Sequence, residues 1–369
     1  MNVVITGAAG FLGKNLEVRL GELKDVCVRR IVRTSTRDDL AAALSDADFV
    51  FHLAGVNRPS DAAEFETGNA DVTVRLADEV AHTGRRIPVA FASSTQGALD
   101  NPYGRSKRRA EDALFALSAE HGSSVFVFRL PNVFGKWSRP NYNSAVATFC
   151  HNVARDLPIN VDPSSSVTLV YVDDVVDTFI QAMRGDMTAS LAPLEVEPTY
   201  TMAVRDLAEQ IRAFRDCRTS LLAERVGTGL TRALYATYVS FLPSERFAYS
   251  LPTHGDARGV FVEMLKTPDA GQFSYFTSHP GVTRGGHYHH TKTEKFLVLK
   301  GRAQFRFRHI VTGERHELVT VGGEPQVVET IPGWAHDITN IGAEEMLVML
   351  WANEIFDRAR PDTFASPLA

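Results

Sequence analysis

Apolar and polar positions along residues 1–243 follow two alternating periods. Residues 2–6 form a short apolar run that ends at the first glycine, and Phe11 to Leu20 then carries apolar residues at helical spacing. Strand-like runs recur at 26–32, 49–53, 89–91 and 125–128, and helical stretches at 37–47, 71–84, 173–184 and 204–214. Strands that alternate with helices predict a doubly wound parallel sheet of the Rossmann type, and the last two helical stretches predict a smaller substrate lobe.

The pattern changes after about residue 243, where Pro243, Pro252 and Gly255 interrupt the chain. Short strand-like runs then follow at 260–265, 272–276, 295–299, 303–308, 317–321, 326–330 and 346–351. Closely spaced strands separated by glycine and proline turns are typical of an antiparallel sandwich or barrel. We therefore predict an α/β domain over residues 1–243 and an all-β domain over residues 244–369.

Composition narrows the class of protein. Hydrophobic residues make up 44% of the chain and charged residues 22%, which is ordinary for a soluble globular protein. The net charge of −5 includes no long run of one sign, so nothing favours binding to nucleic acid or to an anionic membrane. The three cysteines lie far apart, which favours reduced thiols over a disulfide framework. No apolar run approaches the ~20 residues of a membrane-spanning helix. We expect a cytoplasmic protein, since no signal sequence precedes the first strand.

Three glycines follow the first strand and open a helix. Gly7, Gly10 and Gly13, with Phe11 and Leu12 between them, have the spacing of a dinucleotide-binding loop. Glycines allow a tight turn and bring backbone N–H groups against a pyrophosphate at the positive end of the helix. The alternative is a turn without a ligand.

The end of the second predicted strand should read the adenosine ribose of such a cofactor. Position 33 is arginine, and no acidic residue occupies positions 31–36. An arginine pairs with a 2′-phosphate, whereas a carboxylate would repel it, so we predict NADPH in preference to NADH. The alternative is that Arg33 is an ordinary surface charge.

Tyr103 and Lys107 lie one helical turn apart, on the same face of a predicted helix. We expect the lysine charge, together with an oxidised nicotinamide, to lower the pKa of the phenol from its usual value of ~10. Tyr103 would then exchange a proton with a carbonyl or hydroxyl oxygen while the nicotinamide exchanges a hydride. Ser94, at the end of a strand, is placed to hydrogen-bond the same oxygen.

These motifs together resemble the extended short-chain dehydrogenases/reductases, over residues 1 to about 243. In that family the segment His52-Leu53-Ala54-Gly55 flanks the cofactor, which adds Leu53, Ala54 and Gly55 to the cofactor-binding candidates. The segment Pro131 to Gly135 would lie near the nicotinamide and the substrate, with Asn132 as a substrate-binding candidate. The alternative for Asn132 is a turn residue. The extended branch of the family mostly handles nucleotide-linked sugars.

Four residues of the C-terminal half have the spacing of a metal site. His287, His289 and Glu294 fit the first motif of the cupin family, and His336 fits the second, although Pro332 adjoins Gly333 directly. On a strand, residues i and i+2 share a face, and we expect Glu294 and His336 to arrive from adjacent strands. Imidazole and carboxylate ligands suit zinc, iron, manganese or nickel. The alternative is a cluster of structural histidines.

A second stretch, Asp256 to Glu263, resembles the D-x-R-G-x-F-x-E segment of dTDP-sugar 3,5-epimerases. The resemblance implies that Arg258 binds the nucleotide diphosphate, and it makes Glu263 a substrate-binding candidate. The alternative is an ordinary salt-bridged pair on a strand. The general base of that family is not carried over, because the corresponding His287 would be a metal ligand.

Both halves, in this order, resemble a family of bifunctional capsular-polysaccharide enzymes. The resemblance includes the segments 55–59, 101–104, 136–144, 289–292 and 361–363. It implies a zinc-bearing cupin that epimerises C3 of a UDP-2-acetamido-2,6-dideoxy-4-hexulose, and a reductase that then reduces C4 with NADPH. The product would be UDP-N-acetyl-6-deoxy-L-talosamine, on the route to N-acetyl-L-fucosamine. The family also favours a homodimer.

The order of the two steps follows from the chemistry, because a C3 proton is acidic only while C4 is a ketone. A metal could polarise that ketone or could only brace the fold, and the sequence leaves both roles open. His290, Lys292 and Lys295 lie near the metal motif and are candidates for proton transfer, with exposure to solvent as the alternative. Two other functions stay open: a non-catalytic NADP sensor, and a reductase fused to a metal-dependent oxygenase or isomerase.

Overall fold

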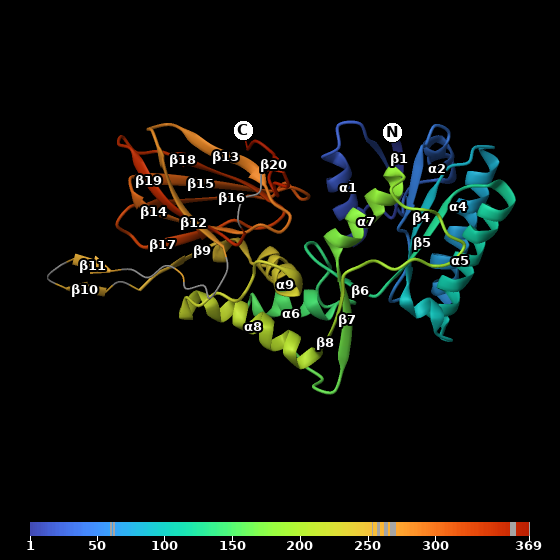
Figure 1. Ribbon diagram of the computed structural model, residues 1–369, viewed down its shortest axis with the longest axis horizontal. Coiled ribbons are helices and arrows are strands. Elements are labelled where there is room, and N and C mark those ends of the chain that lie inside the picture. The colour runs from blue at the N-terminus through green and yellow to red at the C-terminus, as the bar shows by residue number, and fades with distance from the viewer. Residues whose placement is uncertain are drawn as a thin grey trace. The chain divides into compact units, whose positions relative to one another are not determined.

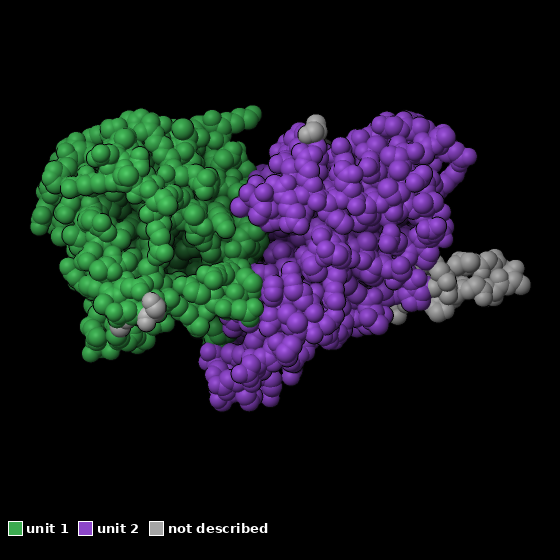
Figure 2. Space-filling model, turned by 180° about the vertical axis from the view of Figure 1, so that it is seen from behind, with its two compact units in different colours: residues 1–144, 167–201 green, residues 145–166, 202–369 purple. Residues whose placement is uncertain are grey.

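The computed structural model describes residues 1–59, 61, 63–252, 254–256, 259–261, 265, 271–354 and 359–368. The chain forms two compact units (Figure 2), one made of residues 1–144 and 167–201 and the other of residues 145–166 and 202–369. The second unit thus combines helices of the predicted substrate lobe with the C-terminal strands. A domain boundary near residue 243 remains a prediction.

A five-stranded parallel sheet forms the centre of the first unit, in the order β2-β1-β3-β4-β5. Its strands are β1 (Asn2–Thr6), β2 (Cys27–Ile31), β3 (Phe49–His52), β4 (Val89–Ser94) and β5 (Val125–Leu130). β3 is buried along its whole length, as expected for a strand covered on both faces. The next two strands of the chain, β2 and β3, lie on opposite sides of β1. The carboxyl ends of β1 and β3 therefore form the switch point, where ligands of such sheets bind.

Helices cover both faces of this sheet. Figure 1 shows α1 and α7 on one side and α4 and α5 on the other. The helical segments are α1 (Phe11–Gly21), α2 (Arg37–Leu44), α3 (Ala63–Phe65), η1 (Glu66–Ala70), α4 (Asp71–His82), η2 (Thr95–Ala98), α5 (Pro102–His121) and α7 (Val172–Arg184). On α7, Val172, Val175, Val176 and Phe179 are buried and form one apolar face against the sheet. The predicted Rossmann-type fold of this half is confirmed.

A second, three-stranded sheet follows in the order β6-β7-β8. It contains β6 (Asn132–Phe134), β7 (Ser166–Tyr171) and β8 (Thr199–Ala203), with β6 and β7 parallel. β6 directly follows β5, so this sheet places the segment after residue 131 beside the carboxyl end of the main sheet.

The helices of the second unit are α6 (Ala145–Val153), α8 (Val204–Ser220), α9 (Gly229–Ser240) and the short η3 (Ser244–Arg246). α6 packs against α8 and α9. A buried ionic cluster joins these helices to the strands, because the Glu329 carboxylate pairs with both Arg218 on α8 and Lys295 on a strand. Lys295 and Glu329 are almost completely buried. Such a pair is costly to break, since loss of one partner leaves an uncompensated charge.

The strands of the second unit form two five-stranded antiparallel sheets, in the orders β12-β19-β14-β17-β9 and β16-β15-β18-β13-β20. The strands are β9 (Ala248–Ser250), β12 (Gln272–Ser278), β13 (Thr283–Tyr288), β14 (Glu294–Lys300), β15 (Arg302–His309), β16 (Arg315–Val321), β17 (Gln326–Glu329), β18 (Trp334–Asn340), β19 (Met346–Ala352) and β20 (Phe364–Ala365). β10 (His254–Asp256) and β11 (Gly259–Phe261) form a separate hairpin.

The two sheets pack through buried apolar side chains, which alternate with less buried ones on β15. On β15, Ala303, Phe305 and Phe307 are buried at every second position. The rings of Phe296 on β14 and Phe305 lie 5.8 Å apart between centroids, so the two sheets share one core. The predicted antiparallel architecture is confirmed, although β13 and β18 were not among the strand-like runs. No helix in the described ranges is long and apolar enough to cross a membrane.

Candidate active site and metal centre

The glycine loop after β1 is shaped by close backbone approaches. Gly7 has a φ of +69°, and a Cβ there would lie 2.7 Å from the backbone nitrogen of Ala54. A Cβ at Gly13 would lie 2.4 Å from the carbonyl oxygen of Gly7. Real Cβ atoms do not approach so closely, so both positions require glycine. The loop therefore lies directly against the residues that follow β3, at the switch point of the sheet.

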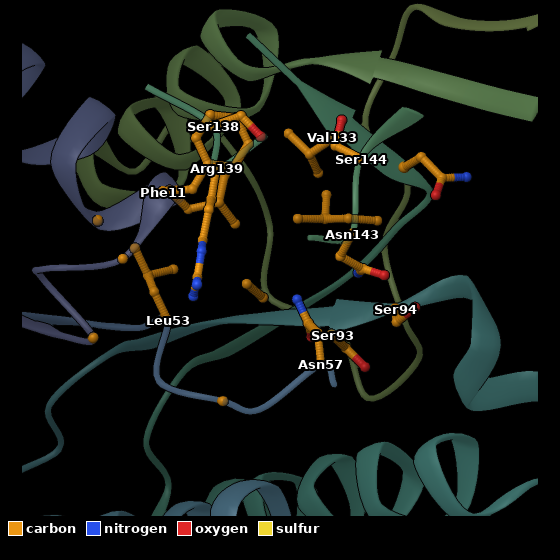
Figure 3. A pocket seen from close by; sticks show the side chains of 18 of the residues that line it. Phe11, Leu53, Asn57, Ser93, Ser94, Val133, Ser138, Arg139, Asn143 and Ser144 are labelled. Carbon is orange, nitrogen blue, oxygen red and sulfur yellow. The ribbon is translucent and has the colours of Figure 1, made fainter. Parts of the chain in front are cut away.

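A cavity of about 490 Å³ opens above this loop (Figure 3). Its lining includes most of the predicted site residues of this half: Gly7, Gly10, Phe11, Leu12, Gly13, Leu53, Gly55, Ser94, Tyr103, Lys107 and Asn132. Ala54 does not line it. The lining residues include Lys14, Lys107 and Arg139 but, within the described part of the chain, no aspartate or glutamate. This charge distribution favours an anionic ligand such as a nucleotide.

Arg33 lies outside this lining, as an exposed residue two positions beyond β2. The end of β2 is where a ribose 2′-substituent is read in this fold. The position suits the predicted role, and the preference for NADPH remains a prediction.

Tyr103 and Lys107 lie on α5, whose first turn is fixed by the Asn101 side chain, which accepts a hydrogen bond from the Gly104 N–H (2.8 Å). Gly104 allows the helix to approach η2 closely, since a Cβ there would lie 2.3 Å from the Gln96 carbonyl oxygen. Lys107 Nζ donates to the carbonyl oxygen of Ala92 on β4 (3.1 Å) and lies 6.0 Å from the centre of the Tyr103 ring. The structure thus brings Ser94, Tyr103 and Lys107 together on one wall of the cavity.

Burial dominates the electrostatics of this wall. It raises the pKa of Tyr103 above its usual 10, and a hydrogen bond with Ser94 opposes that rise only in part. Burial also lowers the pKa of Lys107 to about 8, against the attraction of the Glu111 carboxylate. The expected lowering of the tyrosine pKa, which included the charge of an oxidised nicotinamide, is not found for the protein groups by themselves. Desolvation of the phenolate is the largest contribution to the raised pKa.

Asn57 is a contact of the tyrosine that the motifs did not single out. Tyr103 Oη donates a hydrogen bond to Asn57 Oδ1 (3.1 Å). The loop that carries Asn57 is held by Asn69, which accepts from the Val56 N–H (2.8 Å) and donates to Ser106 Oγ (3.1 Å). Asn57 lies in a segment noted only for its family resemblance, and no spacing rule connects it to Tyr103.

The segment that begins with β6 forms a further part of the cavity lining. Asn132 is exposed, and its Nδ2 donates to the Thr168 carbonyl oxygen on β7 (3.1 Å). Trp137 and Asn141 have φ values of +66° and +52°, which non-glycine residues adopt at some cost. Between them, the Arg139 guanidinium lies over the Tyr142 ring at 4.8 Å and points into the cavity (Figure 3).

The predicted metal ligands come together in the second unit. One ligand atom from each of His287, His289, Glu294 and His336 lies within 4.8 Å of the others. His287 on β13 and His336 on β18 are register partners in one sheet, whereas Glu294 begins β14 in the other sheet. The expectation that Glu294 comes from a strand adjacent to His287 is therefore wrong. The cluster bridges the two sheets.

The chemistry of this donor set fits a divalent cation. Burial, with the neighbouring His336 and His289, lowers the pKa of His287 to about 3, so its imidazole is neutral at physiological pH. Although burial opposes ionisation, contacts with His289 and His336 hold the pKa of Glu294 well below its usual value. His336 Nε2 is buried and makes no hydrogen bond within the described part of the chain, 3.5 Å from Glu294 Oε2. Neutral imidazoles and a carboxylate are ordinary ligands for zinc and similar ions.

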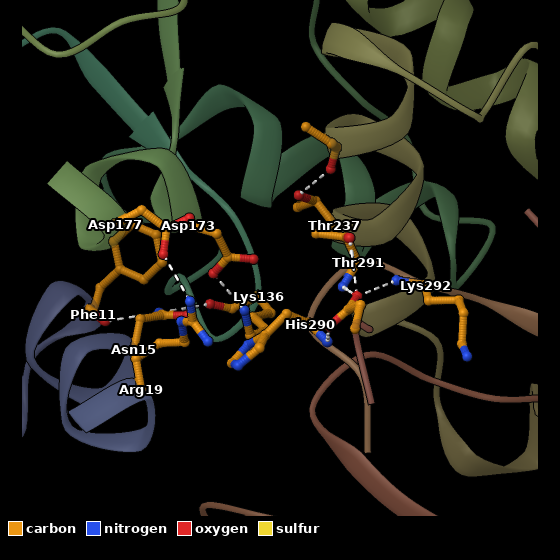
Figure 4. A network of polar contacts seen from close by, with 12 residues as sticks. Phe11, Asn15, Arg19, Lys136, Asp173, Asp177, Thr237, His290, Thr291 and Lys292 are labelled. Carbon is orange, nitrogen blue, oxygen red and sulfur yellow. Dashed lines mark hydrogen bonds and ion pairs between the residues drawn. The ribbon is translucent and has the colours of Figure 1, made fainter. Parts of the chain in front are cut away.

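Asp362 supports this centre from the C-terminal end of the chain. Its carboxylate accepts hydrogen bonds from the backbone N–H groups of His290 (2.9 Å), Thr291 (2.7 Å) and Lys292 (2.7 Å). Figure 4 labels these three donor residues. The Asp362 carbonyl oxygen also contacts His289 Nδ1. Asp362 therefore fixes both the loop between the ligands and the ring of one ligand, which is how outer partners orient metal sites. The sequence offered only a resemblance at this position.

The proton-transfer candidates near the metal motif are all buried: His290 is 5% exposed, Lys292 8% and Lys295 1%. The alternative that they face solvent is wrong. Lys292 Nζ lies 3.4 Å from Glu294 Oε1 and donates to Thr363 Oγ1 (3.2 Å). Lys295 belongs instead to the ionic cluster with Glu329. Arg258 and Glu263, the substrate-binding candidates of this half, lie outside the described residues.

Comparison with known proteins identifies the family to which the chain belongs. Residues 3–189 match the NAD dependent epimerase/dehydratase family, and residues 254–364 match the polysaccharide biosynthesis C-terminal domain. A Pseudomonas aeruginosa protein, UDP-2-acetamido-2,6-beta-L-arabino-hexul-4-ose reductase, is 57% identical over 99% of this chain and 98% of its own length. The chain belongs to the NAD dependent epimerase/dehydratase family.

Within the epimerase/dehydratase family, the likeness to one group of structures extends over the whole chain. The capsular polysaccharide assembling protein CapF from Staphylococcus aureus is 40% identical, with both chains covered completely and a TM-score of 0.69. The predicted resemblance to capsular-polysaccharide enzymes is confirmed. UDP-glucuronic acid 4-epimerase from Bacillus cereus is 18% identical over 58% of this chain and 83% of its own, with a TM-score of 0.53, and so shows the fold alone.

Proposed function

We propose that this protein is a bifunctional UDP-sugar enzyme, which epimerises C3 of a UDP-2-acetamido-2,6-dideoxy-4-hexulose and then reduces the C4 ketone with NADPH. The observation that carries the proposal is the cavity that joins Ser94, Tyr103 and Lys107 to a glycine loop. The Pseudomonas aeruginosa relative is named as a reductase of a 4-keto amino sugar nucleotide, which supports the substrate class. The product would be UDP-N-acetyl-6-deoxy-L-talosamine, a precursor for N-acetyl-L-fucosamine in a surface polysaccharide.

The reductase step needs a proton donor beside the ketone. NADPH supplies the hydride when it is bound along the glycine loop. Tyr103 Oη gives its proton to the C4 oxygen, and its raised pKa keeps the phenol protonated at neutral pH. Ser94 Oγ hydrogen-bonds the same oxygen. The Lys107 ammonium then stabilises the phenolate that remains.

Epimerisation must precede reduction, because the C3 proton is acidic only while C4 is a ketone. We place this step in a cupin-type barrel formed by the two antiparallel sheets of the second unit. His287, His289, Glu294 and His336 would hold a zinc or similar ion, which could polarise the ketone or brace the fold. Lys292 and His290, both buried beside these ligands, are the candidates for moving the C3 proton.

Three further features complete the proposal. The charge on Arg33 favours NADPH over NADH, which a comparison of kcat/KM for the two cofactors tests. Arg258 would bind the nucleotide diphosphate. The family resemblance favours a homodimer, which light scattering of the purified protein measures directly.

The experiment that tests the function is product NMR in heavy water with the 4-keto sugar, with and without NADPH. We expect deuterium at C3 in both samples, and reduction at C4 only with NADPH. Tyr103→Phe should lower NADPH oxidation by about 10³-fold or more while leaving the C3 exchange intact, because it removes only the proton donor of the reductase. Loss of C3 exchange in this variant would contradict the division of labour. Return of the unlabelled substrate by the wild-type protein would contradict the function itself.

A further inference from the structure

A buried carboxylate lies one helical turn beyond Lys107 and is not used in the mechanism above. Glu111 is 1% exposed. Its Oε1 accepts hydrogen bonds from Ser93 Oγ (2.5 Å) and from Arg129 Nε (3.0 Å), and its Oε2 accepts from Arg129 Nη2 (2.6 Å). Charge-assisted, bidentate pairs of this kind are among the strongest and best-oriented polar contacts in proteins.

The partners of Glu111 come from the elements that carry the reacting groups. Ser93 directly precedes Ser94 at the end of β4, and its register partner on β5 is Arg129. On α5, Tyr103, Lys107 and Glu111 are spaced four residues apart and share one helix face. The carboxylate thus connects the strand end that presents Ser94 to the helix face that presents the tyrosine and the lysine.

The turn that follows Ser94 also packs on this carboxylate. A Cβ at Gly97, within η2, would lie 3.0 Å from Glu111 Oε1. The glycine therefore lets η2 close over the ion pair. The position of η2 is further restricted by the close approach of Gly104 to the Gln96 carbonyl oxygen. Both contacts set the distance between the end of β4 and the first turn of α5.

The charge of Glu111 also acts on Lys107. Among the described residues, the titratable groups that interact with the lysine are Tyr103 and Glu111 on its own helix and His52 on β3. Burial and the lysine charge lower the pKa of His52 to about 3, so His52 is neutral. Glu111 attracts the ammonium and opposes the lowering of the lysine pKa by burial.

We propose that Glu111 is a positioning residue of the reductase, which holds Ser94 against the Tyr103 and Lys107 face and supports the lysine charge. This inference rests on the proposed reductase function. A purely structural ion pair would affect stability alone, and buried ion pairs can often be replaced by uncharged groups without loss of the fold. The position of Glu111 between the two reacting elements predicts an effect on turnover instead.

The test is Glu111→Gln, which keeps the shape and removes the charge. We expect kcat for NADPH oxidation to fall about 10- to 100-fold, because small displacements of reacting groups are costly. The NADPH dissociation constant should stay within about twofold, since the glycine loop is untouched. The loss of kcat on the alkaline side should begin about one pH unit lower, because the ammonium loses its anion and gains an unbalanced Arg129.

A second variant guards against simple destabilisation. Glu111→Gln combined with Arg129→Gln leaves no unpaired charge, so it should recover the thermal stability of the wild type. It should keep the lowered kcat and a smaller alkaline shift, because the ammonium still lacks the Glu111 anion. Asp46→Asn, which breaks an exposed bidentate pair with Arg29, is the matched control and should behave as the wild type. Wild-type kcat and pH dependence in both Glu111 variants would overturn the proposal. Failure of the wild-type protein to oxidise NADPH would instead contradict the reductase function.

Discussion

In the first unit, the residues around the cavity follow the carboxyl ends of neighbouring parallel strands, whereas in the second unit the four ligand candidates are divided between two antiparallel sheets. The first arrangement relies on backbone: Gly7 and Gly13 shape the loop, and Gly104 sets the approach of α5. The second relies on side chains, of which His289 is oriented by the distant Asp362. A site built from backbone requires glycine where a side chain would clash. A site built from side chains requires hydrogen-bond partners that orient its ligands.

The backbone site should be most sensitive to an added methyl group. Gly13→Ala places a Cβ 2.4 Å from the Gly7 carbonyl oxygen, so the loop must shift away from the pyrophosphate position. We expect NADPH affinity to fall at least about 100-fold, measured by fluorescence titration, with metal content unchanged. Gly21→Ala, where nothing lies within 4 Å of the added atom, is the control and should bind normally. Parallel loss of metal would show that the two sites are not separate in the way described.

The side-chain site should respond in the opposite way. His289→Ala removes one of the four ligand candidates and should lower the bound metal, measured by mass spectrometry of the purified protein, by about tenfold or more. NADPH binding should be unaffected. The exposed His279, changed to alanine, provides the control. Unchanged metal content in the His289 variant would reject the four-ligand assignment.

A smaller effect is expected one layer behind the ligands. Asp362→Asn keeps the size of the side chain but weakens its contacts with three backbone N–H groups, so we expect metal affinity to fall about tenfold. Competition with a chelator measures this loss, and Asp216→Asn, at an exposed position of α8, is the matched control. Equal affinities for the wild type and the Asp362 variant would mean that the ligand loop holds its shape without this anchor.

The same contrast explains what the sequence could predict. Tyr103 and Lys107 form a local pattern, because α5 holds both and its period fixes their relation. The glycine trio and the two histidines at 287 and 289 are local only in their spacing, since Gly13 lies in α1 and His289 follows the end of β13. Glu294 lies near the other three ligand candidates but comes from the other sheet, since a motif gives spacing along the chain and not the sheet to which a strand belongs.

Contacts between residues far apart in the sequence have no local sequence pattern that would predict them. Asp362 lies 72 positions after His290, and Asn57 reaches Tyr103 across 46 positions. Lys295 reads as a surface residue by type, yet it is buried because Glu329 compensates its charge. The raised pKa of Tyr103 follows from burial in three dimensions, which the spacing of tyrosine and lysine does not reveal.

The last described residues also support the candidate metal site. β20 pairs with β13 at His287 and Tyr288, and Asp362 holds the following loop. C-terminal ends usually tolerate deletion well. A stop codon just before position 362 would leave nearly every strand intact, but it would remove the carboxylate that holds the loop between the ligand candidates. Loss of a few residues at this terminus should therefore be as harmful as a substitution in the centre itself.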